Sequence, residues 1–135
     1  MALITWSSKY SVGVETLDEQ HKALLAVLNE FHAASMTGKA QQVAGPLMRQ
    51  IVSLAREHFS TEQRMMESTN FPGLAGHRAK HGELMAKLAE FASRHERGDK
   101  AMYAELLYFM RDWLSHHMQN EDREYALWFA SRGVR

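Results

Sequence analysis

The chain has 135 residues, which is enough for one domain with a continuous core. Sixteen basic residues balance sixteen acidic ones, so net charge favours neither nucleic acid nor an anionic membrane as a partner. The absence of cysteine excludes disulfides, thiolate metal sites and a cysteine nucleophile, and we expect a cytoplasmic protein. We find no apolar run of membrane-spanning length and no signal-peptide pattern, so we expect no membrane insertion.

The beginning of the chain divides into an arm and a first helix. Residues 1–16 lack helical periodicity and are predicted to form an irregular arm, anchored on the domain by apolar residues such as Trp6. Residues 17–37 repeat apolar side chains and histidines at spacings of three and four, which predicts an amphipathic helix. Gly38 follows its last turn, where glycine commonly ends a helix.

A second apolar stripe predicts a helix at about residues 43–67. Its start falls between Ala40 and Pro46, because proline is tolerated in the first turn of a helix. Residues 70–73, with the sequence Asn-Phe-Pro-Gly, form a turn signal that ends it.

Two further stripes predict helices at about residues 74–96 and 100–131, separated by a glycine and an aspartate at positions 98 and 99. Four amphipathic helices joined by short loops are typical of an up-down-up-down bundle. The sequence therefore predicts an all-α, four-helix bundle with an irregular N-terminal arm, in a single domain spanning residues 1–135.

Polar residues interrupt the apolar stripes of all four helices. They are His21, His58, Glu62, His77, His81 and His117. A single histidine of this kind is more often a hydrogen-bonded core residue than a ligand. Six polar residues in one core are different, because buried imidazoles need partners and a buried carboxylate is costly without a compensating charge. In antiparallel helices the five histidines fall in one layer, which predicts a transition-metal site.

The sequence leaves one carboxylate undecided. Glu121 follows His117 by four residues and Asp122 follows it by five, which is about 140° round a helix. Helical geometry alone favours Glu121. The remaining histidines, at positions 32, 95 and 116, lie off this layer or point away from it, and we interpret them as structural or surface residues.

These residues resemble the hemerythrin family, specifically its short bacterial members, over nearly the whole chain. The resemblance rests on the ordered set of five histidines and two carboxylates. The matching stretches include Asp18-Glu-Gln-His21, His58-Phe-Ser-Thr-Glu62, His77-Arg-Ala-Lys-His81 and His117-Met-Gln-Asn-Glu-Asp122. The family pattern places the last carboxylate five residues after the last histidine. It therefore implies Asp122 as the ligand and a local distortion of the fourth helix.

The resemblance further implies a pair of iron ions with a bridging oxo or hydroxo group. One iron would be held by His77, His81 and His117, and the other by His21 and His58. Glu62 and Asp122 would bridge the two irons. The second iron would keep an open position for dioxygen.

A small apolar O2 pocket over this open position is also implied by the resemblance. Its lining would be Leu24, Phe59, Trp113, Leu114 and Met118. Three positions depart from the usual family pattern, with Gln63 in place of a second glutamate, Leu54 in place of tyrosine and Met118 in place of isoleucine. None of these departures removes a ligand, but each can change the surroundings of the site.

The function that the resemblance implies is reversible dioxygen binding, for storage, transport or delivery. Five imidazoles outnumber two carboxylates, and the Glu-x-x-His motif of ferritin-like oxidases is absent, so we predict binding rather than an enzyme. We expect a monomer whose ligand is dioxygen, with a client protein left open. Three alternatives are an O2 or redox sensor acting through a partner, an enzyme acting on peroxide or nitric oxide or storing iron, and a metal-free bundle. We expect no separate output domain within this length, and the buried ligand set disfavours the metal-free bundle.

Overall fold

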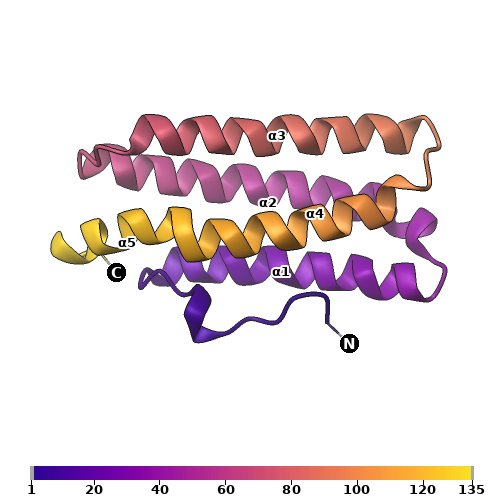
Figure 1. Cartoon of the computed structure of the whole chain (residues 1–135), viewed down its shortest axis with the longest axis horizontal. Coiled ribbons are helices and arrows are strands. Elements are labelled where there is room, and N and C mark those ends of the chain that lie inside the picture. Colours follow the sequence, from indigo (N-terminus) through magenta and orange to yellow (C-terminus); the bar gives the residue numbers. More distant parts are fainter. Residues whose placement is uncertain (1, 135) are drawn as a thin grey trace.

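The computed structural model describes residues 2–134, so the first and last residues of the predicted domain lie outside the described part. Its helices run along one long axis, with the N-terminal arm beside α1 (Figure 1). In chain order the elements are the 3-10 helix η1 (Ser8–Tyr10), α1 (Glu15–Met36), α2 (Ala40–Ser68), α3 (Leu74–Glu96), α4 (Met102–His116), the π-helical segment η2 (His117–Glu121) and α5 (Asp122–Ser131).

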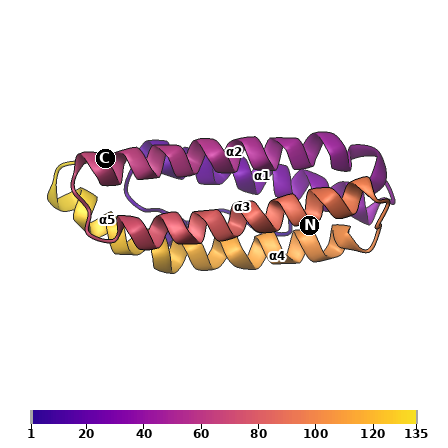
Figure 2. The same cartoon turned by 90° about the horizontal axis from the view of Figure 1, so that it is seen from above.

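The long helices pack in a ring: α1 against α2, α2 against α3, and α3 against α4, while α4 also packs against α1. Figure 2 shows the same antiparallel arrangement from above. This confirms the predicted all-α, up-down-up-down bundle. Gly38 and Gly98 have φ angles of 74° and 79° in two of the connecting turns. Glycine adopts this left-handed conformation without steric strain, so the chain can leave α1 and α3 and reverse direction.

The first two helices begin at or before the earliest residues that the sequence suggests. α1 starts at Glu15, two residues before the predicted start, and α2 starts at Ala40, the first residue of the predicted interval. Pro46 therefore lies in the second turn of α2, not in the first. At that position proline removes the backbone donor that would bond to the carbonyl of Gln42.

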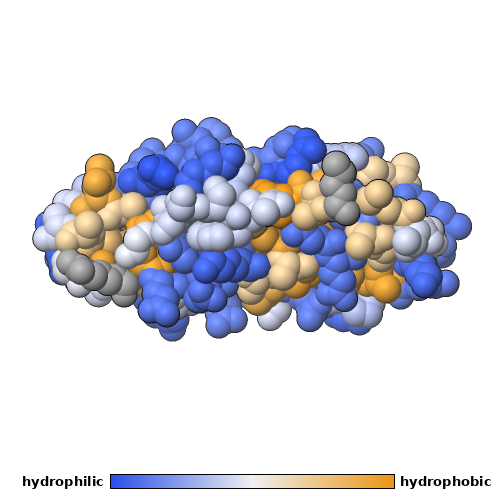
Figure 3. Space-filling model, turned by 90° about the horizontal axis from the view of Figure 1, so that it is seen from below, coloured by the Kyte–Doolittle hydropathy of each residue, from blue (hydrophilic) through white to orange (hydrophobic). Residues whose placement is uncertain are grey.

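The N-terminal arm is tied to α1 by two sets of hydrogen bonds. The carboxylate of Asp18 accepts hydrogen bonds from the Ser11 hydroxyl (2.5 Å) and the Val12 amide (2.9 Å). Further along, the side chain of Asn29 bonds both the N–H and the carbonyl of Ile4, at 3.1 and 2.8 Å. Figure 3 shows this face of the molecule, where hydrophilic residues separate the apolar areas. None of the helices described is both long and apolar enough to span a membrane.

The core consists of two apolar clusters with a polar layer between them. The larger cluster fills most of the bundle and includes Phe31, Leu88, Phe91, Met102 and Leu106. The smaller cluster contains Val12, Val14, Leu17, Met66, Tyr125 and Phe129. On α1, His21 lies between Leu17 of the smaller cluster and Leu24 of the larger one. On α2, Glu62 lies between Phe59 of the larger cluster and Met66 of the smaller one.

Candidate metal centre

The fourth helical segment contains the distortion that a spacing of five residues requires. In η2 the N–H of Asp122 bonds to the carbonyl of His117, which is the i to i+5 pattern of a π-helix. The extra residue in this turn brings both side chains to the inner face, and His117 Nε2 lies 2.8 Å from Asp122 Oδ1. Both residues are fully buried. A regular α-helix would have pointed Asp122 away from the core.

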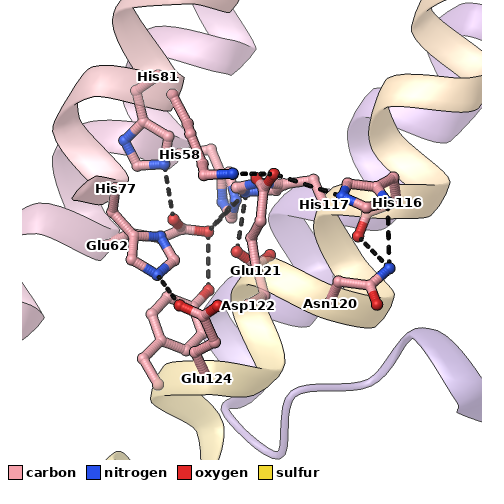
Figure 4. A network of polar contacts seen from close by, with 12 residues as sticks. His58, Glu62, His77, His81, His116, His117, Asn120, Glu121, Asp122 and Glu124 are labelled. Carbon is pink, nitrogen blue, oxygen red and sulfur yellow. Dashed lines mark hydrogen bonds and ion pairs between the residues drawn. The ribbon is translucent and has the colours of Figure 1, made fainter. Parts of the chain in front are cut away.

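The structure brings all seven predicted ligand residues together in two groups that share Glu62. The first group is His21, His58, Glu62, His117 and Asp122, and the second is Glu62, His77 and His81. Within each group the candidate ligand atoms lie within 4.8 Å of one another. The side chains come from every helix of the bundle, and Figure 4 shows several of them converging on Glu62.

Many polar atoms of this layer are buried without a hydrogen-bond partner among the described residues. They include Nε2 of His21, His58, His81 and His117, both ring nitrogens of His77, both oxygens of Asp122 and Oε2 of Glu62.

These unpartnered atoms nevertheless lie close to one another. His21 Nε2 is 2.9 Å from Asp122 Oδ2, and His81 Nε2 is 3.1 Å from Glu62 Oε2, without hydrogen-bond geometry. Buried polar atoms are rarely left unsatisfied. Ring nitrogens and carboxylate oxygens that face each other across short gaps can both act as metal ligands, so cations between them would satisfy them. The residues therefore fit a two-metal site with imidazole and carboxylate ligands.

Metal binding needs neutral imidazoles and ionised carboxylates. The surroundings of His58 and Glu62 favour these states. Burial is the main cause that lowers the pKa of His58, which keeps this imidazole neutral. Burial alone would raise the pKa of Glu62, but the imidazoles that surround it, His58 first among them, hold its pKa well below the usual range. Glu62 is therefore ionised although it is fully buried.

The pKa of His117 shifts in the opposite direction from that of His58. Burial would lower its pKa, but the charge of the adjacent Asp122 carboxylate and the hydrogen bond to Glu121 raise the pKa of His117 well above its usual value. A metal ion at this position would replace the proton, because ligand imidazoles bind in the neutral form.

The outer ring nitrogens of two histidines contact partners that fix the rings. His58 Nδ1 lies 2.9 Å from Gln20 Oε1, and Gln20 in turn donates to the Thr61 hydroxyl at 3.0 Å. A proton on Nδ1 of His58 is thereby held by Gln20, which leaves Nε2 free to bind a metal. His81 Nδ1 lies 2.9 Å from the Gln63 amide. An Nδ1–H on His81 bonds to this amide when the amide oxygen faces the ring.

His117 has a charged partner. Its Nδ1 lies 2.6 Å from Oε2 of Glu121, and the other oxygen of Glu121 accepts a hydrogen bond from Lys80 Nζ at 3.1 Å. The hydrogen bond from His117 is the main cause that lowers the pKa of Glu121 to about 2, with Lys80 adding to it. Spacing alone favoured Glu121 as a ligand. In the structure Glu121 instead contacts the outer nitrogen of His117, whereas Asp122 faces the centre.

Tyr125 supports the shared carboxylate. Its hydroxyl donates a hydrogen bond of 2.8 Å to Glu62 Oε1, and its ring stacks on His77 with centroids 5.4 Å apart. Burial, together with the charges of Asp122 and Glu62, raises the pKa of Tyr125 well above its usual value. The hydroxyl therefore stays protonated and acts as a donor.

The residues of the expected O2 pocket border this layer on the side of the larger apolar cluster. Leu24, Leu114 and Met118 are buried in that cluster. Phe59 stacks on His81 with centroids 3.8 Å apart, and Trp113 stacks on His117 at 4.5 Å. The polar centre thus has an apolar cover on this side.

Sequence reasoning missed three partners of the ligand candidates, namely Gln20, Glu121 and Tyr125. The i+4 spacing from His117 was a signal for Glu121, since this spacing places side chains in contact on a helix. Gln20 and Tyr125 had no comparable signal, because their contacts cross between helices.

Comparisons with known proteins agree with this geometry. The family model described as the hemerythrin HHE cation binding domain matches residues 12–129. A bacteriohemerythrin from Ralstonia nicotianae is 30% identical over 98% of this chain and 93% of its own length. A bacteriohemerythrin from Stenotrophomonas maltophilia is 29% identical over 93% of this chain and 81% of its own length.

A myohemerythrin and a solved structure extend the likeness. The myohemerythrin of Riftia pachyptila is 30% identical over 89% of this chain and 88% of its own length. A crystal structure of wild-type hemerythrin superposes with a TM-score of 0.85 at 26% identity, covering 93% of this chain and 96% of the other. The matched segment includes all seven buried ligand candidates, and the chain belongs to the hemerythrin family.

Proposed function

We propose that this protein binds dioxygen reversibly at a pair of iron ions, for storage, transport or delivery. The observation that carries the proposal is the layer of buried, unpartnered imidazole and carboxylate atoms, which bound cations would satisfy. Family membership supports iron and dioxygen as the metal and the ligand.

The ligand assignment that we propose follows the family pattern, whereas distance alone groups His117 with His21 and His58. His77, His81 and His117 would hold one iron, and His21 and His58 the other, with Glu62 and Asp122 bridging them. The central position of Glu62 supports its role as a bridge, because its two oxygens face different histidines. Oε2 lies 3.1 Å from His81, and Oε1 contacts His58 on the other side.

A bound iron pair, with its bridging oxo or hydroxo group, would supply an open coordination position and two electrons that dioxygen can take up and return. The protein's part is to hold the geometry and exclude water. Tyr125 restrains Glu62, and Gln20 fixes the ring of His58. Leu24, Leu114 and Met118 keep one side of the site apolar, which hinders the proton supply that O–O cleavage would need.

This apolar cover is why we favour binding over turnover of peroxide or nitric oxide. We also propose that the protein acts as a monomer. The large apolar side chains that are exposed among residues 2–134 are Met36, Tyr108 and Leu127, which lie on different helices and not in one patch.

The proposal is tested by reconstituting the purified protein with ferrous iron under anaerobic conditions. We expect two irons per chain and a visible charge-transfer band that forms with O2 and disappears when O2 is removed. His21→Gln should lower the iron content, whereas His32→Gln, on the same helix but outside the layer, should not. A band that forms once and never reverts would contradict reversible binding and favour oxidase chemistry.

A further inference from the structure

The outer nitrogens of three ligand candidates contact side chains of different charge. Gln20 lies beside His58 and Gln63 beside His81, and both are neutral amides. His117 is the one of these three whose partner is a carboxylate, that of Glu121, at a distance of 2.6 Å. Of these three histidines, His117 therefore has the only negatively charged partner.

The position of Glu121 follows from the π-helical segment. The extra residue in η2 turns Asp122 toward the centre, and it leaves Glu121 beside the Nδ1 edge of His117 (Figure 4). Lys80 reaches across from α3, where it lies between His77 and His81 in sequence, and holds the second oxygen of Glu121. Glu121 is only 8% exposed, so solvent screens its charge weakly.

We propose that Glu121 is a positioning residue that makes His117 a more electron-rich ligand and so stabilises the ferric state of the iron bound by His77, His81 and His117. This inference rests on the proposed iron pair. A charge-assisted hydrogen bond from Nδ1–H to a carboxylate is stronger than one to an amide. It shifts negative charge onto the imidazole and raises the basicity of Nε2, which faces the metal.

The electron balance is simple. Each ferrous ion that becomes ferric gives one electron to the oxidant, which is dioxygen or a redox mediator, and the proton on His117 Nδ1 stays in the hydrogen bond to Glu121. The added positive charge on the iron is stabilised by the nearby carboxylate. Among residues 2–134, Nδ1 of His58 contacts the Gln20 amide and Nδ1 of His21 has no hydrogen-bond partner, so the proposed histidine ligands of the other iron lack a carboxylate in this position. We therefore expect the two irons to differ in how readily they are oxidised.

The substitution Glu121→Gln tests the inference, because it keeps the shape of the acceptor and gives His117 the same kind of partner as His58 and His81. We expect the ferric state to lose about tenfold in relative stability, which raises the midpoint potential by about 59 mV for one electron. The measurement is a mediated potentiometric titration of the iron-loaded protein.

Two matched variants use the neighbouring amide. Gln63→Glu places a carboxylate beside His81 on the same iron, and we expect it to lower the midpoint potential. The double variant with Glu121→Gln should return the potential toward that of the wild type. Equal potentials in the wild type and in Glu121→Gln, with two irons bound in each, would overturn the inference.

A readout without redox chemistry separates this inference from the proposed function. In zinc-loaded protein, the nitrogen NMR signals of His117 should report a strongly hydrogen-bonded Nδ1–H in the wild type and a weaker one in Glu121→Gln. Identical signals in the two proteins would overturn the inference even if O2 binding proved reversible. A shifted signal and a shifted potential without a reversible O2 band would support the inference and contradict the proposed function.

Discussion

The larger apolar cluster and the polar layer are parts of the same core but differ in how their buried atoms are satisfied. In the larger apolar cluster, side chains such as Phe31, Phe91 and Leu106 are at most 2% exposed and satisfy one another by packing. In the polar layer, residues such as Glu62 and Asp122 are equally buried but retain unpartnered atoms. The apolar cluster holds the bundle together, whereas the unpartnered atoms of the layer lower stability unless cations bind them.

Typical free energies show how differently the two regions contribute to stability. A buried polar group without a partner costs about 1–3 kcal/mol, and several such groups lie in the layer. Burial of apolar side chains contributes about 1.5–3 kcal/mol each and is independent of metal. Substitutions in the two regions should therefore separate stability from metal binding.

The largest effect on stability is expected in the apolar cluster. Phe91→Ala should lower the free energy of unfolding by about 3–5 kcal/mol, because it leaves a cavity in a packed core. Iron content should remain at two per chain, since the residue does not contact the layer. Urea unfolding and metal analysis check the two halves of this prediction. Loss of iron without loss of stability would contradict the separation.

The next largest effect is expected in the layer. Asp122→Asn removes a buried charge between the histidines and should weaken iron binding about 100-fold or more, which is about 2.7 kcal/mol. The measurement is a competitive titration with a chelator. Asp112→Asn serves as the control, because this side chain lies exposed on α4. Equal iron affinity in the two variants would remove Asp122 from the site.

Tyr125 in the layer and Tyr103 outside it allow the stabilities of two single hydrogen bonds to be compared. Tyr125 donates to the buried carboxylate of Glu62, whereas Tyr103 lies 3.2 Å from His95 Nδ1 at the far end of the bundle. Tyr125→Phe should destabilise the iron-loaded protein by about 1.5–3 kcal/mol, and Tyr103→Phe by about 0.5–1.5 kcal/mol. Thermal unfolding of both variants measures the difference, and a reversed order would contradict it.

The smallest effect concerns acid stability at the surface. Hydrogen bonds from Arg94 lower the pKa values of Asp99 and Glu105 at the α3–α4 turn. The folded state therefore binds fewer protons than the unfolded chain near their usual pKa values, and this contribution is present above about pH 4.5 and is lost as the pH falls. Arg94→Ala should reduce the loss of stability between about pH 5 and pH 3. An unchanged slope would show that these ion pairs contribute nothing.

The fold was predictable because its signals are local. Apolar stripes with a period of 3.6 and turn residues such as Gly38 and Gly98 predict the number and order of the helices. The start of α2 was predictable only as an interval from Ala40 to Pro46, because a proline near the start of a helix does not fix the first helical residue.

The site was predictable only in part. The buried histidines could be identified from their places in apolar stripes. The inward position of Asp122 required the family pattern, because regular helical geometry points to Glu121 and the π-helical turn has no sequence signal of its own. Partners such as Gln20 could not be predicted, since their contacts depend on how two helices are rotated against each other.

The most direct test of the account is the iron content of the anaerobically reconstituted protein, measured together with its melting temperature before and after chelation. The account predicts two irons per chain and a lower melting temperature once they are removed, since binding to the folded state alone stabilises it. A protein that binds no iron, and melts at the same temperature with chelator as without it, would contradict the claim that the polar layer is built to hold metal.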